Sequence, residues 1–193
     1  PAVGGDGSIT GFLRERRNLF ARNHPVNVAW TLEKALALPA MTAMISVRRA
    51  TPADGPAYVR LVRALAEFEK LPPPDEAAAG RLVADAFSEP PRYELWIAEL
   101  DGAVVAYAVT FATYSTFRGK PTLFLEDLFV HPDARRRGVA RAVLARLREE
   151  AGARGCGRFE WFVLDWNEDA QALYRGVGAR PLTEWQLWRV DLP

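Results

Sequence analysis

The chain contains very few of the residues that usually hold metals or form disulfides. Among its 193 residues there is one cysteine, Cys156, and there are two histidines, His24 and His131. A single cysteine excludes an internal disulfide and a cysteine-based metal cluster. Two histidines so far apart in the sequence do not make a plausible first coordination shell, so we expect no metal. The free thiol fits a reducing compartment, and we expect a cytoplasmic protein.

Long apolar runs and a surplus of one charge are also missing. No run of 18 apolar residues occurs, so we expect neither a transmembrane helix nor a membrane partner. The net charge is +1, and the 22 arginines are scattered rather than interleaved with aromatic residues, so we expect no nucleic-acid partner. An apolar content of 49% with 25% charged residues is typical of one soluble globular domain.

Residues 1–43 differ from the rest of the chain. They start with a glycine-rich stretch, continue with an arginine-rich one, and show only a weak helical pattern over 26–40. We expect an extension outside the folded domain 44–193, with Met44 as a natural beginning because Ile45 opens a strand at once. An acid-poor N-terminus that contains arginine can also be an organelle transit peptide, and that alternative stays open.

From residue 44 onward, periodicity and turn residues predict the order β-α-α-β-β-β-α-β-α-β. A strand from Ile45 is followed by helices over about 51–68 and 75–87, started by Thr51 and Asp75. Strands follow over 93–99, 103–114 and 122–130, the first two joined by the hairpin signal Asp101-Gly102. A helix over 139–153, a strand over 158–165 buried on both faces, a helix over 169–176 and a strand over 187–191 complete the series. The fold class is mixed α/β, with helices on both faces of a mostly antiparallel sheet.

The stretch 124–148 is the centre of this pattern. It is predicted to form a strand, a turn and a helix, and three arginines with Gly138 stand where the helix begins. Arginines and free backbone N–H groups at a helix start can bind an anion such as a phosphate. The alternative is an ordinary connection whose arginines are solvated.

Two motifs carry a resemblance to a known family. The segment Arg135-Arg-Arg-Gly138-Val-Ala140 resembles the R/Q-x-x-G-x-G/A motif of the GNAT superfamily, the acetyl-CoA-dependent N-acetyltransferases. The segment 166–178, from Trp166-Asn to Gly178, resembles the second signature of that superfamily. The segments 65–69 and 125–130 look like the spermidine/spermine (diamine) branch, which includes thialysine acetyltransferases. The resemblance covers 44–193 and none of 1–43.

The resemblance implies a GNAT-type fold, acetyl-CoA as the co-substrate, a small-molecule amine as the acceptor, direct transfer in a ternary complex, and a homodimer. The residues it implies for the cofactor are Leu128, Phe129, Val130, Arg135, Arg136, Arg137, Gly138, Val139, Ala140, Arg141, Asn167, Asp169, Ala170 and Tyr174. Backbone groups of Leu128 and Val130 would bind the pantetheine arm like an added strand.

Two residues are candidates for the catalytic chemistry. Attack of an amine on a thioester expels a thiolate, and the hydroxyl of Tyr174 can supply the proton that this leaving group needs. The amine arrives as an ammonium and must first lose a proton, which Glu126 could take directly or through a water. A core tyrosine and a salt-bridged glutamate are the alternatives.

The substrate-binding candidates are Phe68, Glu69, Glu126, Asp127 and Trp185. Because neighbouring strand residues point to opposite faces, we expect Glu126 and Asp127 on opposite sides of the sheet. The acceptor class is a polyamine, diamine or amino-acid-like amine. At Thr116 the polyamine enzymes resembled here carry an acid, so a long polycation would have one anchor fewer, which favours a shorter amine, an amino acid or an aminoglycoside-like acceptor. The rival functions are a protein or peptide N-acetyltransferase and a non-catalytic acyl-CoA-binding domain.

Overall fold

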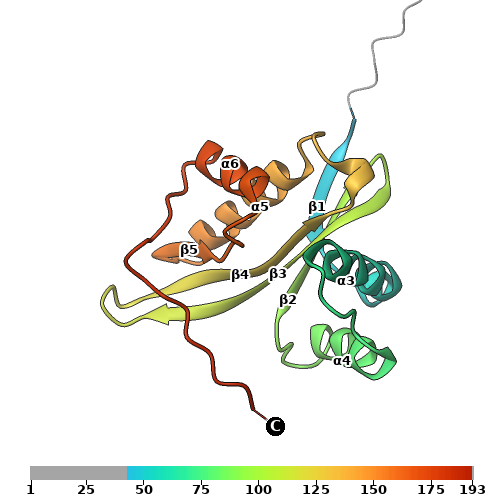
Figure 1. Cartoon of the computed structure of the whole chain (residues 1–193), viewed down its shortest axis with the longest axis horizontal. Coiled ribbons are helices and arrows are strands. Elements are labelled where there is room, and N and C mark those ends of the chain that lie inside the picture. Colours follow the sequence, from blue (N-terminus) through green and yellow to red (C-terminus); the bar gives the residue numbers. More distant parts are fainter. Residues whose placement is uncertain (1–42, 193) are drawn as a thin grey trace, which may run out of the picture. The chain divides into compact units, whose positions relative to one another are not determined.

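A computed structural model describes residues 43–192 as a five-stranded sheet with helices on both faces (Figure 1). In chain order the elements are β1 (Ile45–Arg49), the 3-10 turn η1 (Pro52–Asp54), α3 (Gly55–Glu69), α4 (Glu76–Ala86), β2 (Glu94–Leu100), β3 (Ala103–Ser115), β4 (Lys120–Val130), the 3-10 turn η2 (Pro132–Ala134), α5 (Val139–Ala153), β5 (Arg158–Trp161) and α6 (Glu168–Gly176). The predicted order is confirmed as far as α6.

The strands lie side by side in chain order. The three pairs from β1 to β4 are antiparallel, and β4 pairs with β5 in parallel, so the predicted mixed, mostly antiparallel sheet is confirmed. Asp101 and Gly102 join β2 to β3 with φ angles of 54° and 82°, as a two-residue hairpin turn requires. The parallel pair needs a crossover connection, and α5 supplies it.

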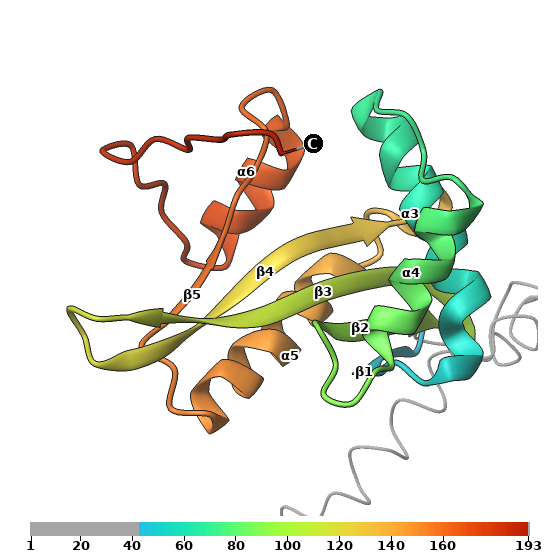
Figure 2. The same cartoon turned by 90° about the horizontal axis from the view of Figure 1, so that it is seen from below.

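Each face of the sheet has its own core, because successive strand residues alternate between the faces. The stripe predicted for the central helix is buried on one face, where Val143 and Leu147 of α5 pack against Ala108 and Leu123 of the strands. On the opposite face, Tyr58 of α3 packs against the strands. Figure 2 shows α5 behind the sheet and α3 and α4 in front of it.

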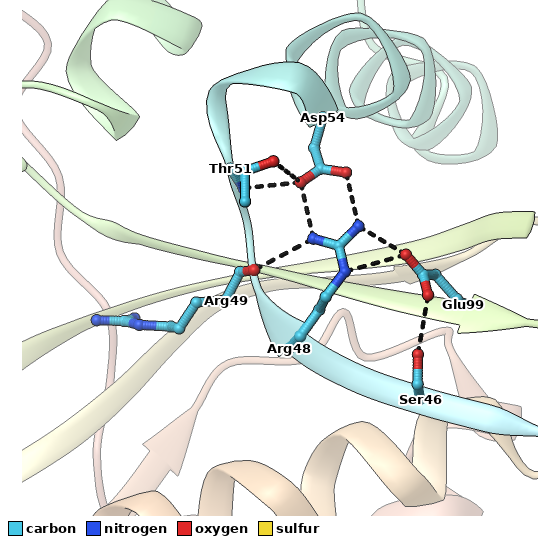
Figure 3. A network of polar contacts seen from close by, with 6 residues as sticks. All are labelled: Ser46, Arg48, Arg49, Thr51, Asp54 and Glu99. Carbon is cyan, nitrogen blue, oxygen red and sulfur yellow. Dashed lines mark hydrogen bonds and ion pairs between the residues drawn. The ribbon is translucent and has the colours of Figure 1, made fainter. Parts of the chain in front are cut away.

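A polar network fixes the place where α3 begins (Figure 3). The Arg48 guanidinium on β1 donates to both carboxylate oxygens of Asp54 at 2.8 and 2.9 Å, and to Glu99 on β2 at 2.6 Å. Asp54 also accepts from the backbone N–H of Thr51 at 2.7 Å. Arg48, with a smaller effect of Thr51, holds the pKa of Asp54 well below its usual range. The network ties α3 to the edge of the sheet.

The strand predicted over 158–165 is wrong in length and in burial. β5 ends at Trp161, and the ring of Phe162 is 65% exposed. Burial on both faces requires packed helices above and below the strand, whereas every residue of β5 is only half-buried; within residues 43–192 the strand lies at the sheet edge and pairs only with β4. The apolar run therefore continues past the point where pairing ends.

The strand predicted over 187–191 is also wrong. Residues 179–192 form neither helix nor strand, and Trp188 and Val190 are 85% and 84% exposed. Alternating apolar residues are suited to a strand, but a strand is stable only when its backbone groups are paired. The described residues provide no partner strand for this segment.

Residues 1–42, and with them nearly all of the predicted extension and the transit-peptide alternative, lie outside the described residues. Within residues 43–192, no helix combines the length and the apolar character that crossing a membrane requires.

Candidate active site

A β-bulge in β4 reorganises the middle of the candidate site. Val109 of β3 pairs with Asp127, and the next residue of β3 pairs with Leu125, so Glu126 has no partner across the strand pair. Leu125 and Leu128 pack on the same α5 face although they are three positions apart, which strict alternation forbids. The bulge supplies the extra residue.

Because of the bulge, Glu126 and Asp127 both face α3. Glu126 follows Leu125 and takes the opposite face by alternation, and Asp127 shares its face with the buried Tyr107, to which it is hydrogen-bonded. The prediction that these two acids lie on opposite sides of the sheet is therefore wrong. Sequence periodicity could not reveal the bulge, since the strand pattern is apolar on both sides of it.

Three acids on this face have no salt-bridge partner among the described residues. The half-buried Glu69 ends α3, Glu126 is exposed at the bulge, and Asp127 is half-buried beside it. None of the three acids forms a salt bridge with a described residue. Other acids in residues 43–192 do pair with arginines. Burial, followed by the charge of Glu126, raises the pKa of Asp127 to about 6, and Glu69 adds to the effect. The face is electrostatically prepared for a positively charged group.

β4 and β5 separate where the bulge begins. The two strands are paired from Thr122 to Leu125 of β4, and beyond Leu125 no strand within residues 43–192 pairs with that edge of β4. In Figure 2 the chain after β5 rises toward α6 while β4 runs on toward the end of α3. The backbone groups of Leu128 and the N–H of Val130 that point to this edge are therefore available to a ligand, whereas the Val130 carbonyl accepts from Arg135 Nε at 3.2 Å.

The turn before α5 offers backbone N–H groups that suit an anion. Gly138 lies just before the helix with a φ of 89°, and Arg136 has a φ of 61°, which is uncommon for a residue with a side chain. The first N–H groups of α5, at Val139, Ala140 and Arg141, have no acceptor within the helix. Positive partial charge at this helix start favours a phosphate.

The four arginines around this turn have different neighbours. Arg135 stacks over the rings of Phe68 and Phe129, at 4.7 and 5.7 Å, and its Nε donates to the Val130 carbonyl. Arg137 pairs with Asp101 at 3.1 Å. Arg141 donates to the Gly176 carbonyl at the end of α6, at 3.3 Å. Only the Arg136 guanidinium has no partner among the described residues.

Helix α6 begins after Asn167 and carries Tyr174, as the sequence predicts. The Asn167 side chain accepts from the N–H of Ala170 at 3.1 Å and caps the helix. The Tyr174 ring packs against Trp161 at the end of β5, with ring centroids 5.0 Å apart. Burial raises the pKa of Tyr174, and its hydroxyl bonds to no residue that the structure describes. The phenol is therefore protonated at neutral pH and can donate a proton.

Two aromatic candidates have different surroundings. Phe68 near the end of α3 contacts Trp166, with ring centroids 5.6 Å apart, so it spans from α3 to the segment before α6. Trp185 is 74% exposed in the segment without regular structure, and it contacts none of the described aromatic rings. Phe68 thus links the end of α3 to the segment before α6, whereas the structure gives Trp185 no such contact.

Comparison with known proteins agrees with this geometry. Residues 60–179 match the family model described as Acetyltransferase (GNAT) family. The chain belongs to the GNAT family of acetyltransferases. It is similar to the thialysine N-epsilon-acetyltransferase of Bos taurus, with 36% identity over 154 residues that cover 76% of this chain and 90% of that protein. The predicted family, enzyme class and thialysine branch are thereby confirmed.

Other similarities are more distant. The L-ornithine N5-acetyltransferase NATA1 of Arabidopsis thaliana is 34% identical over 103 residues, which cover 53% of this chain and 45% of that protein. A solved aminoglycoside N-acetyltransferase, AAC(6')-Iy in complex with CoA, matches with a TM-score of 0.65 at 20% identity. The match covers 80% of this chain and 100% of that chain. At that identity the structural match shows the GNAT fold alone.

Sequence reasoning missed Tyr107. It lies wholly buried in β3 and donates a hydrogen bond from its hydroxyl to Asp127 Oδ2 at 3.3 Å. A tyrosine within an apolar strand is usually a core residue. Only the pairing of β3 with β4 brings it to the acid, and no local motif in this GNAT sequence marks that pairing.

Proposed function

We propose that this GNAT enzyme transfers the acetyl group of acetyl-CoA to a primary amine of a small molecule, by direct attack in a ternary complex. The observation that carries the proposal is the group of three acids, Glu69, Glu126 and Asp127, on one face beside the separation of β4 and β5. Acids without a cation partner among the described residues suit an acceptor that arrives as an ammonium.

The acceptor must lose a proton before it attacks. Glu126 is exposed at the bulge, so the proposed base can reach the ammonium directly or through a water. The neutral amine then attacks the carbonyl carbon of the thioester, and in this proposal the backbone N–H of Leu128 donates to the oxyanion. Tyr174 gives its phenolic proton to the departing thiolate, which agrees with a phenol kept protonated by burial, and the proton that the attacking nitrogen loses as the amide forms restores the phenol.

Acetyl-CoA supplies the activated acetyl group, and the chain offers groups that suit its parts. The backbone groups of Leu128 and the N–H of Val130 can bind the pantetheine arm as an added strand would. Arg136, Gly138 and the first N–H groups of α5 suit the diphosphate. Arg135 and Arg137 already have partners on Phe68 and Asp101, so Arg136 contributes most of the side-chain charge.

The acceptor is proposed to be a short diamine or an amino acid with a side-chain amine. The names of relatives that act on thialysine and ornithine support this class. Thr116 supports it as well, because this chain lacks an acid there and a long polycation would have one anchor fewer.

The experiment is a panel of amines assayed for release of the CoA thiol with acetyl-CoA. It contains thialysine, ornithine, lysine, putrescine, spermidine, an aminoglycoside and a lysine peptide. Turnover of the short amines, with weak or no turnover of the peptide, is the expected result. CoA binding without release from any amine would overturn the proposed reaction, and a clear preference for the peptide would overturn the acceptor class.

We further propose that the enzyme is a cytoplasmic homodimer. Support for the compartment is the single free cysteine. Support for the dimer is the exposed apolar segment after α6, which includes Trp188 and Val190. Several large exposed apolar side chains within one segment are typical of an interface.

A further inference from the structure

We propose that Tyr107 is a positioning residue of the acceptor site, whose hydroxyl holds the Asp127 carboxylate so that Asp127 anchors the ammonium of the substrate. This proposal rests on the function proposed above, because it requires an amine acceptor. It adds two roles to that function. Asp127 binds the ammonium of the substrate, and the buried Tyr107 acts by positioning Asp127.

The geometry comes from strand pairing and the bulge. Asp127 pairs with Val109, and Tyr107 lies two positions before Val109 on the same face of β3. The Tyr107 hydroxyl reaches Asp127 diagonally across the strand pair, with 3.3 Å between Oη and Oδ2. The Tyr107 side chain is fully buried, so neighbouring side chains fix the direction of its hydroxyl.

The surroundings of Asp127 contain negative charge and neutral hydroxyls. Glu126 flanks it on β4, Glu69 and Tyr58 face it from α3, Tyr107 faces it from β3, and Tyr93 before β2 also senses its charge. None of the residues that the structure describes forms a salt bridge with it. A half-buried carboxylate in such surroundings is costly, and one hydrogen bond from a neutral hydroxyl offsets only part of that cost. A substrate ammonium would provide the missing cation.

Tyr58 provides a matched control for Tyr107. Its ring packs edge-on against the Tyr107 ring, with centroids 5.1 Å apart, and it is equally well buried. Its hydroxyl, however, bonds to the Tyr93 hydroxyl at 3.1 Å, and Tyr93 donates onward to the Leu82 carbonyl. Loss of the Tyr58 hydroxyl therefore changes the same core without removing the bond to Asp127.

The test compares wild type, Tyr107→Phe and Tyr58→Phe with the best amine of the panel. In Tyr107→Phe we expect KM for the amine to rise about five- to tenfold, the change that loss of one hydrogen bond of ordinary strength produces. KM for acetyl-CoA should stay within twofold. Tyr58→Phe should leave both constants near those of the wild type.

The pH profile gives a readout that a purely structural role would not move. The Tyr107 hydrogen bond favours the ionised form of Asp127, so its loss raises the pKa of that carboxyl further. The acidic limb of kcat/KM should shift to higher pH in Tyr107→Phe and not in Tyr58→Phe. An acidic limb and an amine KM equal to those of the wild type would overturn the proposal.

A second variant decides the matter if Tyr107→Phe does not fold. Asp127→Asn keeps the shape of the side chain and an acceptor for Tyr107, but removes the charge. It should raise KM for the amine more than tenfold and abolish the acidic limb near pH 6. An Asp127→Asn enzyme with the amine KM and pH profile of the wild type would overturn the proposal. Absence of turnover in the wild type itself would instead overturn the proposed function, so the two failures are distinguishable.

Discussion

At the scale of single residues, Asp127 illustrates how a binding site can oppose folding. A buried carboxyl that lacks a cation is disfavoured in its charged form, and its pKa of about 6 lies above the ordinary 3.8. The folded protein therefore holds this proton more tightly than the unfolded chain does. Below about pH 4 the carboxyl is protonated in both states and costs nothing, and the full cost is present above about pH 6.

Asp127→Asn should therefore stabilise the protein at neutral pH. We expect a gain on the order of 1–2 kcal/mol in unfolding free energy at pH 7.5 and a gain near zero at pH 4, because the variant has no charge to bury. Urea unfolding at both pH values measures the difference. Glu126→Gln is the control, since the exposed Glu126 should give a much smaller gain; a stability gain for Asp127→Asn that is equal at both pH values would contradict the assigned cause.

The sequence predicts which residues belong to the candidate site, but it does not predict the sheet face to which each acid points. Tyr174 and Asn167 stand in a motif with fixed spacing, and the structure places them on and before α6 as expected. The faces of Glu126 and Asp127 depend on the bulge, and the bulge depends on how β3 and β4 are paired. That pairing is a long-range property, so local periodicity assigned one of the two acids to the wrong face.

At the scale of secondary-structure elements, the helix starts are well encoded. Asp75 accepts from the Ala78 N–H at 2.7 Å and caps α4, as its position before the apolar pattern predicts. Strand lengths are encoded less well, because a strand extends only as far as its neighbour does. β5 stops at Trp161, where the pairing with β4 ends at the bulge.

Asp54→Ala should loosen the start of α3. The side chain of Asp54 is only 8% exposed and accepts both the Arg48 guanidinium and the Thr51 N–H, so its loss leaves donors unpaired at the edge of the core. We expect a loss of about 2–4 kcal/mol in unfolding free energy at pH 7. Because the folded pKa of Asp54 is depressed, this contribution should fade as the pH falls below about 4.

Glu76→Ala is the matched control for that prediction. It also removes an acid from an arginine, Arg63, but the Glu76 side chain is 91% exposed. An exposed ion pair contributes little, so the loss should be below about 0.5 kcal/mol. Equal losses for Asp54→Ala and Glu76→Ala in chemical denaturation would show that the network in Figure 3 does not organise the helix start.

At the scale of the whole molecule, the segment after α6 is an apolar stretch without regular secondary structure. Its large apolar side chains are exposed, and its strand-like alternation has no partner strand within the described chain. Pairing with a second copy would supply one, which is the physical basis for the proposed homodimer.

Trp188→Glu should therefore weaken the dimer. We expect the wild type to sediment as a dimer at micromolar concentration and the variant to shift toward monomer, because a charge replaces an apolar side chain at the interface. Leu71→Glu is the control, since Leu71 is also exposed but lies beyond the end of α3. A monomeric wild type, or an equal shift in both variants, would contradict the proposal.

The most direct test of the central claim is the turnover number of Tyr174→Phe with acetyl-CoA and the best amine, measured beside Tyr114→Phe as an exposed control. If Tyr174 protonates the departing thiolate, the turnover number should fall about 100-fold or more while KM for acetyl-CoA changes little, and Tyr114→Phe should match the wild type. An unchanged turnover number in Tyr174→Phe would contradict the account.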